Sequence, residues 1–313
     1  MSRSRAQSAP AGFPVGRVAE ATGETGVLFG GLRNLAWIAD RRGDGEQAVR
    51  LQSRALEVAA SIDERATALA LHDLGTFLAS AGRKQEAREA LHLAAERARA
   101  IAYESLEMDA LASVGRLDLY ARDFDAADRS FSLVFAGGHA RELAQQGQRV
   151  GAAYAALGLD RREEARGDFT DAAERMIEAG MTSHYDFSCA LAGIALAADL
   201  ADARRAGRLH GATRRLRERS EFRLNADDDD LERFFEQPFI EALGMVAWKR
   251  EQAAGAALTL NDAIALARSL AAGSNATTCP TEIVKTAAVV PASDEHSHGG
   301  PVSPPLSPLP PSR

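Results

Sequence analysis

Apolar residues recur along most of this chain with the period of an α-helix. In the first such stretch, Leu28, Leu32, Leu35 and Ile38 follow one another at intervals of three or four residues. This spacing places them on one face of a helix. The polar segment 42–45, Arg-Gly-Asp-Gly, interrupts the stripe before a second apolar stripe begins. The pattern predicts two helices joined by a turn.

Small residues occupy equivalent places in four successive predicted helix pairs. Each pair has one small residue in its first helix and two in its second, separated by 12 and then 7 residues. These residues are Ala36, Ala48 and Ala55; Gly75, Ala87 and Ala94; Gly115, Ala127 and Val134; and Ala153, Ala165 and Ala172. Helix axes approach to about 8 Å only where side chains are small, so we expect all twelve to be structural packing positions. The predicted turns, at 43–44, 82–83, 122–123 and 159–160, share one phase.

This pattern resembles the tetratricopeptide repeat, in which a small residue of the first helix faces two small residues of the second. Successive first positions are 39, 40 and 38 residues apart, whereas the standard repeat has about 34 residues. We expect the extra residues in the second helix or in the connection between hairpins. The resemblance implies an all-α fold, a right-handed superhelix of about five helical hairpins with a C-terminal helical cap.

A degenerate fifth hairpin is predicted over residues 186–218, with Gly193 and Ala206 in the small positions. Here the resemblance becomes narrower. Segments 191–195 and 207–213 are similar to the terminal repeat of the MalT-like arm of large LuxR-type ATP-dependent bacterial transcriptional regulators. The resemblance implies a regulatory or sensor arm of that kind.

The closing elements of the chain extend this similarity. A long helix is predicted from Leu231 to Gln252, and a last helix is predicted to begin after Thr259, with Asp262 as its capping partner. The acidic run 227–230 lacks the ligand spacing of a calcium loop. We interpret it as part of a polar connection, 222–230, whose acidic residues lie ahead of the helix that begins at Leu231, where the helix dipole favours carboxylates.

Three regions are expected. Residues 1–26 are rich in Gly, Pro, Ser and Arg without periodicity and predict a disordered leader. Residues 27–271 form the helical-repeat domain. Residues 272–313 are rich in Pro, Ser and Gly towards the end and predict a disordered tail.

Composition restricts the classes of partner and compartment. A net charge of −7 and a pI near 5.6 do not favour direct nucleic-acid binding, which needs clustered basic residues. The two cysteines, Cys189 and Cys279, form neither a disulfide framework nor a CxxC metal pair. No secretory signal and no apolar run long enough for a membrane span are found, so we expect a cytoplasmic protein.

The chain carries no recognisable catalytic or cofactor motif. The GxxxxGK[ST], GxSxG, HExxH and GxGxxG patterns are absent. The ATPase and DNA-binding domains of the regulators named above are therefore not expected, nor are an enzyme activity, a cofactor or a metal. The pair His296 and His298 lies in the predicted tail and makes a poor metal site.

The groove expected on the concave face supplies the candidate binding residues. Counting from the small residue of each first helix, the groove-facing positions include Asp40 and seven candidate binding residues, Arg33, Trp37, His72, Thr76, Arg116, Tyr120 and Tyr154. Arg, Trp and Tyr are the residue types enriched at binding hot spots. The alternative for Trp37 and Tyr154 is that they complete the core between hairpins.

Three functions are compatible with these features. The first is a non-catalytic scaffold that binds a protein or peptide in the groove, related to the arm of a transcriptional regulator. The second is a DNA-associated regulator fragment, which would bind duplex DNA in a salt-dependent way. The third is an arm that senses a small molecule in the groove.

Overall fold

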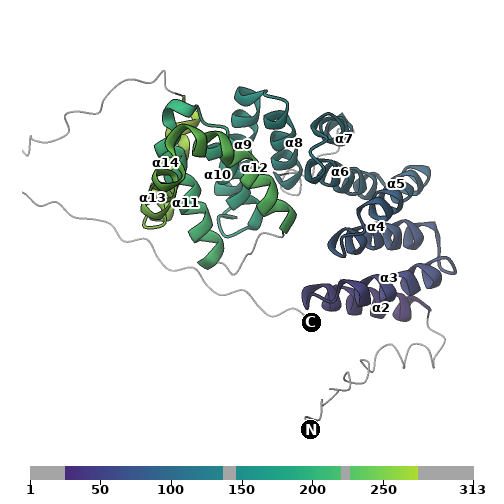
Figure 1. Cartoon of the computed structure of the whole chain (residues 1–313). Helices are drawn as coiled ribbons and strands as arrows, with labels where there is room; N and C mark the ends of the chain where they lie inside the picture. Colours follow the sequence, from purple (N-terminus) through teal and green to yellow (C-terminus); the bar gives the residue numbers. More distant parts are fainter. Residues whose placement is uncertain (1–24, 137–145, 220–225, 274–313) are drawn as a thin grey trace, which may run out of the picture. The chain divides into compact units, whose positions relative to one another are not determined.

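The computed structural model describes residues 25–136, 146–219 and 226–273 (Figure 1). Helices in these ranges form five successive pairs: α2 (Thr25–Arg41) with α3 (Gly45–Ala59), α4 (Glu64–Ser80) with α5 (Lys84–Ala100), α6 (Glu104–Tyr120) with α7 (Phe124–Ala136), α8 (Gln146–Gly158) with α9 (Arg162–Glu178), and α10 (Tyr185–Leu196) with α11 (Ala203–Arg219). Three more helices follow: α12 (Ala226–Leu243), α13 (Met245–Gly255) and α14 (Leu260–Ala271). No strand occurs in the described residues, and the prediction of an all-α fold is confirmed.

The predicted leader and tail lie almost entirely outside the described residues, as do Cys279, His296 and His298. Within the described part of the chain, no helix combines the length and the apolar character needed to cross a membrane.

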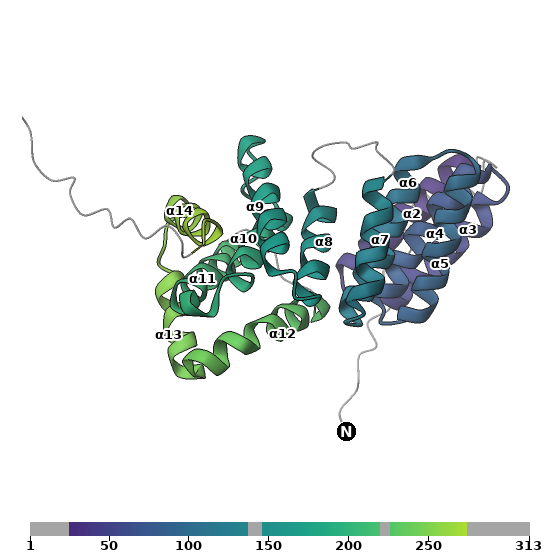
Figure 2. The ribbon, with the colours of Figure 1, turned by 90° about the horizontal axis from the view of Figure 1, so that it is seen from above.

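Consecutive helices from α2 to α7 pack side by side (Figure 2). The alanines and the valine at the twelve predicted packing positions are fully buried, and both glycines are buried as well. At Gly75 a Cβ atom would lie 2.6 Å from Cγ of Leu91 and 3.1 Å from the backbone oxygen of Ala87. A larger side chain on α4 would therefore push it away from α5.

The first four pairs have turns of the same construction. The second residue after the first helix has a positive φ, which is 79° at Gly43, 78° at Gly82, 60° at Arg122 and 60° at Asp160. The next amide donates to the carbonyl five residues earlier, at 2.8 to 3.0 Å. This bond defines a Schellman motif, which stops the first helix and starts the second after few residues. The predicted common phase of the turns is thereby confirmed.

The length of the repeat comes from its helices. The four helices α4, α5, α6 and α9 contain 17 residues each. Short connections such as 81–83 and 101–103 join them. Extra residues are thus found in first as well as second helices, whereas the sequence pattern had indicated the second helix or the connections.

The fifth pair is less regular, as predicted. A 3₁₀ helix, Leu200–Asp202, lies between α10 and α11. A Cβ atom on Gly193 would lie 2.3 Å from Cδ1 of Phe169 on α9. The small residue of α10 therefore packs against the preceding pair, and Ala206 on α11 is fully buried.

The prediction of one long helix over 231–252 is wrong. Gly244 has a φ of 81° and separates α12 from α13. Its amide donates to the carbonyl of Ile240 at 2.8 Å, and its own carbonyl accepts from the amide of Trp248 at 3.0 Å. A glycine in the left-handed region ends one helix and allows the next to start in a new direction.

The predicted N-terminal cap of the last helix is confirmed. Thr259 caps α14, with its hydroxyl accepting from the amide of Asp262 at 3.1 Å and its amide donating to the Asp262 carboxylate at 3.3 Å. The acidic run, in contrast, does not lie ahead of a helix that begins at Leu231, because α12 begins at Ala226 and has Asp227, Asp228 and Asp229 in its first turn.

Backbone contact joins α11 to α13. A Cβ atom on Gly211 would lie 2.0 Å from the carbonyl oxygen of Gln252, and one on Gly255 would lie 1.8 Å from that of Arg208. Only residues without a side chain allow this approach. The crossing fixes the position of α13, from which Figure 2 shows α12 running towards α8.

Candidate functional site

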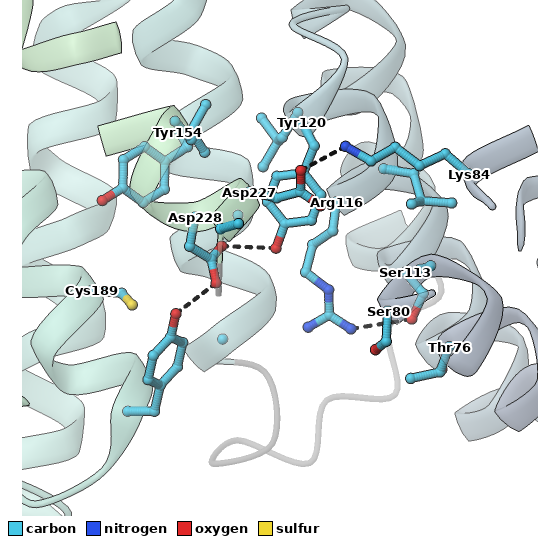
Figure 3. A pocket seen from close by; sticks show the side chains of 18 of the residues that line it. Thr76, Ser80, Lys84, Ser113, Arg116, Tyr120, Tyr154, Cys189, Asp227 and Asp228 are labelled. Atoms are coloured by element: carbon cyan, nitrogen blue, oxygen red, sulfur yellow. Dashed lines mark hydrogen bonds and ion pairs between the residues drawn. The ribbon is translucent and has the colours of Figure 1, made fainter. Parts of the chain in front are cut away.

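A cavity of about 750 Å³ is lined mainly by the first helices of the pairs (Figure 3). Thr76 and Ser80 come from α4, Arg116 and Tyr120 from α6, Tyr154 from α8 and Tyr185 from α10. Residues of the first turn of α12 complete the lining. We refer to this cavity as the groove.

Four of the seven predicted binding residues line the groove: Thr76, Arg116, Tyr120 and Tyr154. Tyr154 also belongs to the core, because it is 6% exposed and its ring packs edge-on against Phe169 at a centroid distance of 4.8 Å. The two interpretations of Tyr154, groove and core, therefore describe the same side chain. Its hydroxyl is buried and has no hydrogen-bond partner within the described ranges.

The other three predicted residues do not line the groove. Nε of Arg33 donates to the carboxylate of Asp73 at 2.7 Å, and Nδ1 of His72 lies 3.6 Å from the same carboxylate. Trp37 is 41% exposed, and its ring stands edge-on to that of Phe77 at 4.9 Å. These side chains form a separate polar and aromatic surface on α2 and α4.

Two tyrosine hydroxyls hold one carboxylate of α12. The Tyr120 hydroxyl donates to Oδ1 of Asp228 at 2.7 Å, and the Tyr185 hydroxyl donates to Oδ2 at 2.6 Å (Figure 3). Burial is the main cause that raises the pKa of Tyr185, and the nearby Cys189 thiol and Asp228 carboxylate raise it further. The phenol therefore stays protonated near neutral pH and remains a donor to the carboxylate.

Two cations hold the neighbouring carboxylates. Nζ of Lys84, at the start of α5, lies 2.6 Å from Oδ1 of Asp227. The Arg122 guanidinium lies 2.7 Å from Oδ2 of Asp230, and it also covers the ring of Phe234 at 4.5 Å. The acidic first turn of α12 is thus bound by α5, α6, α10 and the turn after α6.

Buried side chains anchor α12 immediately after this turn. Leu231 and Phe235 are 5% and 8% exposed. The ring of Phe235 stacks on that of Tyr154 at 5.9 Å and lies 5.8 Å from that of Phe124. Burial of these side chains stabilises α12 on the repeats through the hydrophobic effect.

Arg116 marks a part of the groove that α12 does not fill. Its guanidinium donates to the hydroxyl of Ser113 at 3.2 Å, and Figure 3 shows it beside Ser113 and Ser80. Within the described residues Arg116 forms no ion pair. Burial raises the pKa of Asp186, another lining residue, although His184 and Arg116 oppose this shift.

The sequence did not identify Lys84, Arg122, Tyr185 or Asp228 as site residues. The available signal was the run of four aspartates at 227–230, which needs more partners than a helix dipole supplies. Their partners lie as far as 143 residues away along the chain, for the pair of Lys84 and Asp227. Such pairs depend on α12 folding back over the repeats, which periodicity alone does not reveal.

Solved structures of other helical-repeat proteins are similar to this chain. No family model and no curated protein matches the chain. It is similar to two solved structures of the nearly identical TPR-like repeats of a candidate kinesin light chain from Podosopora anserina, one of them a single-substitution variant. The variant structure has 15% identity and a TM-score of 0.45, over 64% of this chain and 95% of that one. The other has 13% identity and a TM-score of 0.44, over 66% and 94%. At these values the similarity is weak, and the function below is inferred from the geometry of the chain itself.

Proposed function

We propose that this chain is a non-catalytic helical-repeat scaffold that binds a segment of a protein partner in the groove. One observation carries the proposal: the groove already binds a protein segment, the first turn of α12, through side chains from several helix pairs. Hydroxyl donors, the Arg116 cation and aromatic rings offer both directional and apolar contacts to a peptide.

The chemistry of the lining supports binding rather than catalysis. Burial raises the pKa of the Cys189 thiol to about 12, with Arg217 opposing the shift. The thiol therefore stays protonated near neutral pH, whereas a nucleophilic cysteine needs a lowered pKa. In the described part of the chain, no three His, Cys, Asp or Glu side chains are grouped to hold a metal ion.

We further propose that the scaffold serves as a regulatory arm related to those of the MalT-like transcriptional regulators. The fifth hairpin and the helices after it support this, through the segments 191–195 and 207–213. A neighbouring upstream reading frame that encodes a P-loop ATPase is the expected finding. Neighbouring frames of unrelated function would count against a regulatory origin.

Selection from a random-peptide library tests the scaffold function. Peptides that bind the full chain are recovered, and their affinities are measured by calorimetry for the native chain and for Arg116→Ala. We expect a loss of about tenfold on removing the Arg116 guanidinium, because a charged hydrogen bond contributes about 1.5–3 kcal/mol.

Arg175→Ala is the matched control, since Arg175 is exposed on α9 and does not line the groove. Its affinity for the recovered peptides should equal that of the native chain. Peptides that bind the two variants equally well would place their site elsewhere and contradict the proposal.

A second candidate function is the binding of a small polar molecule. The volume of about 750 Å³ lies within the range of about 300–1,000 Å³ that is typical of ligand sites. The buried Tyr154 hydroxyl without a partner is a group that a ligand could satisfy. A metabolite that raises the melting temperature of the native chain but not of Tyr154→Phe would support this function. An equal rise in both would contradict a site at Tyr154.

A further inference from the structure

We propose that the partner segment is acidic and that the first turn of α12 occupies its place in the isolated chain. This inference rests on the function proposed above and specifies its partner. In this view, residues 226–230 are a built-in competitor for the groove, and an acidic segment of another protein binds when it replaces them.

The groups that face residues 226–230 are chiefly hydrogen-bond donors and cations. The Tyr120 and Tyr185 hydroxyls, from two different helix pairs, point at the two oxygens of one carboxylate. Lys84 pairs with the carboxylate of Asp227 and Arg122 with that of Asp230. Such a set is complementary to closely spaced carboxylates and offers a basic segment little to bind.

The charge balance of the groove depends on whether this turn is in place. With the turn removed, the lining cations Lys84 and Arg116 balance the lining carboxylates of Asp40 and Asp186. The carboxylate of Glu232 is already bound by Arg217 at 2.7 Å. The turn leaves behind the groups that bound its carboxylates, namely Lys84, Arg122 and the two phenols, and another acidic segment would find the same partners.

The first turn is the part of α12 that is easiest to displace. Side-chain exposures are 42% and 37% in the pair of Lys84 and Asp227, and 41% and 59% in the pair of Arg122 and Asp230. Exposed ion pairs contribute little to stability, and helix ends open locally. Burial begins at Leu231, so the rest of α12 can stay in place while the turn opens.

Arg116 provides the first contact for an incoming acidic segment. It is exposed and lines the same groove as the bound turn. A carboxylate bound there would lie next to the hydroxyls of Ser113 and Ser80. A partner segment that is longer than the α12 turn therefore gains an anchor that the turn itself does not use.

A peptide with the sequence of residues 226–237, blocked at both ends and labelled with fluorescein, tests the inference in the full chain. Its anisotropy is titrated with the native chain and with a variant that carries Asp227→Asn, Asp228→Asn and Asp230→Asn. We expect the variant to bind the peptide at least about tenfold more tightly, because the built-in competitor is weakened. Asp228→Ala alone, with a smaller gain, serves if the triple variant does not fold.

Three results would overturn the inference. One is equal affinity of the native chain and the variant for the peptide. Another is that the variant binds the peptide no more tightly than a control peptide in which all four aspartates are asparagine. The third is unchanged affinity after adding Tyr120→Phe and Tyr185→Phe to the variant, because these phenols are the proposed carboxylate donors.

The library selection separates this inference from the function on which it rests. One outcome is that both the native chain and the triple variant select peptides whose binding is weakened by Arg116→Ala but which have no excess of acidic residues. That result would support the scaffold function and reject an acidic partner. Recovery of no groove-dependent peptide from either chain would reject both.

Discussion

Arg217 and Glu232 form a buried ion pair directly behind the groove. The two terminal nitrogens of Arg217, Nη1 and Nη2, lie 2.9 and 2.7 Å from the two carboxylate oxygens of Glu232. Nε of Arg217 donates to the hydroxyl of Ser188 at 2.9 Å. His210 lies 3.3 Å from the same carboxylate. Such a pair is costly to break from one side, because the other charge then stays buried without a partner.

The stability of the chain should fall in acid because of Glu232. Burial alone would raise the pKa of Glu232, but Arg217 and His210 outweigh it and hold this pKa at about 2. Since the pKa is lower in the folded than in the unfolded chain, the stabilisation is complete above the unfolded pKa near 4.5 and is lost as the pH falls towards 2. We expect urea unfolding to show a loss on the order of 3 kcal/mol across this window.

Glu232→Gln should remove that part of the pH dependence and lower the free energy of unfolding at pH 7 by about 3–5 kcal/mol. Glu218→Gln is the control, because the side chain of Glu218 is 61% exposed in its pair with Arg215. A Glu232→Gln variant with the native pH profile would show that another group governs the acid transition.

The turn between α5 and α6 has a strained backbone at a single residue, Ala102. Ala102 has a φ of 53°, and the amide of Tyr103 closes the turn on the carbonyl of Ala98 at 2.8 Å. Alanine is strained in this region, whereas glycine is not. Ala102→Gly should therefore stabilise the chain by up to about 1 kcal/mol in urea unfolding.

The reverse substitution at an equivalent turn provides the control. Gly82 has a φ of 78°, and a Cβ atom there would meet nothing within 4 Å. Gly82→Ala should cost about 1 kcal/mol through backbone strain alone. The two variants should change the free energy of unfolding in opposite directions. A change in the same direction would contradict the assignment of backbone strain to Ala102.

At the scale of elements, the crossing of α11 and α13 determines where α12 is held. Gly211→Ala would bring a methyl group against the carbonyl of Gln252 and should destabilise the chain by about 2–3 kcal/mol, as overpacking does. Gly167→Ala, in the middle of α9 with nothing within 4 Å, should stabilise by up to about 1 kcal/mol. Thermal unfolding of both variants gives the comparison, and a neutral Gly211→Ala would show that the helices can separate freely.

The helices themselves could be predicted from periodicity and turn residues, but their junctions less well. Small residues at fixed spacing were enough to identify the first four pairs, because close packing admits few alternatives at Gly75 or Ala87. The break at Gly244 was missed because apolar residues continue in phase from Phe239 to Trp248. A single glycine is a weak signal inside such a stripe, since its φ is set by packing on other helices.

The same reasoning explains which site residues could be predicted. Thr76, Arg116, Tyr120 and Tyr154 follow from their positions on first helices that repeat in register. Tyr185 and Asp228 could not be found this way, because each becomes a site residue only through contact with the other. Local pattern determines which face of a helix is open, whereas the folding back of α12 determines what fills it.

At the scale of the whole molecule, α12 changes how the repeats unfold. Helical repeats contact mainly their neighbours, so their ends can unfold separately. The pair of Lys84 and Asp227 and the bond from Tyr120 to Asp228 connect residues 143 and 108 positions apart. These contacts should make the unfolding of α5, α6 and α12 more concerted.

The double variant Tyr120→Phe and Tyr185→Phe should therefore broaden the urea transition, with an apparent m-value below that of the native chain. Tyr103→Phe is the control, because Tyr103 precedes α6 and does not line the groove. A native m-value in the double variant would show that α12 does not couple the pairs.

The position of α12 near the end of the described chain also determines when the groove becomes occupied during synthesis. The helices that line most of the groove, α4 to α10, are complete once residue 196 has been made. Domains fold from the N-terminus as the ribosome adds about 5–20 residues per second. For a few seconds, a nascent chain presents the groove with its donors in place and without the turn at 226–230. An acidic partner that meets the chain on the ribosome would then bind without competition, and α12 would arrive second.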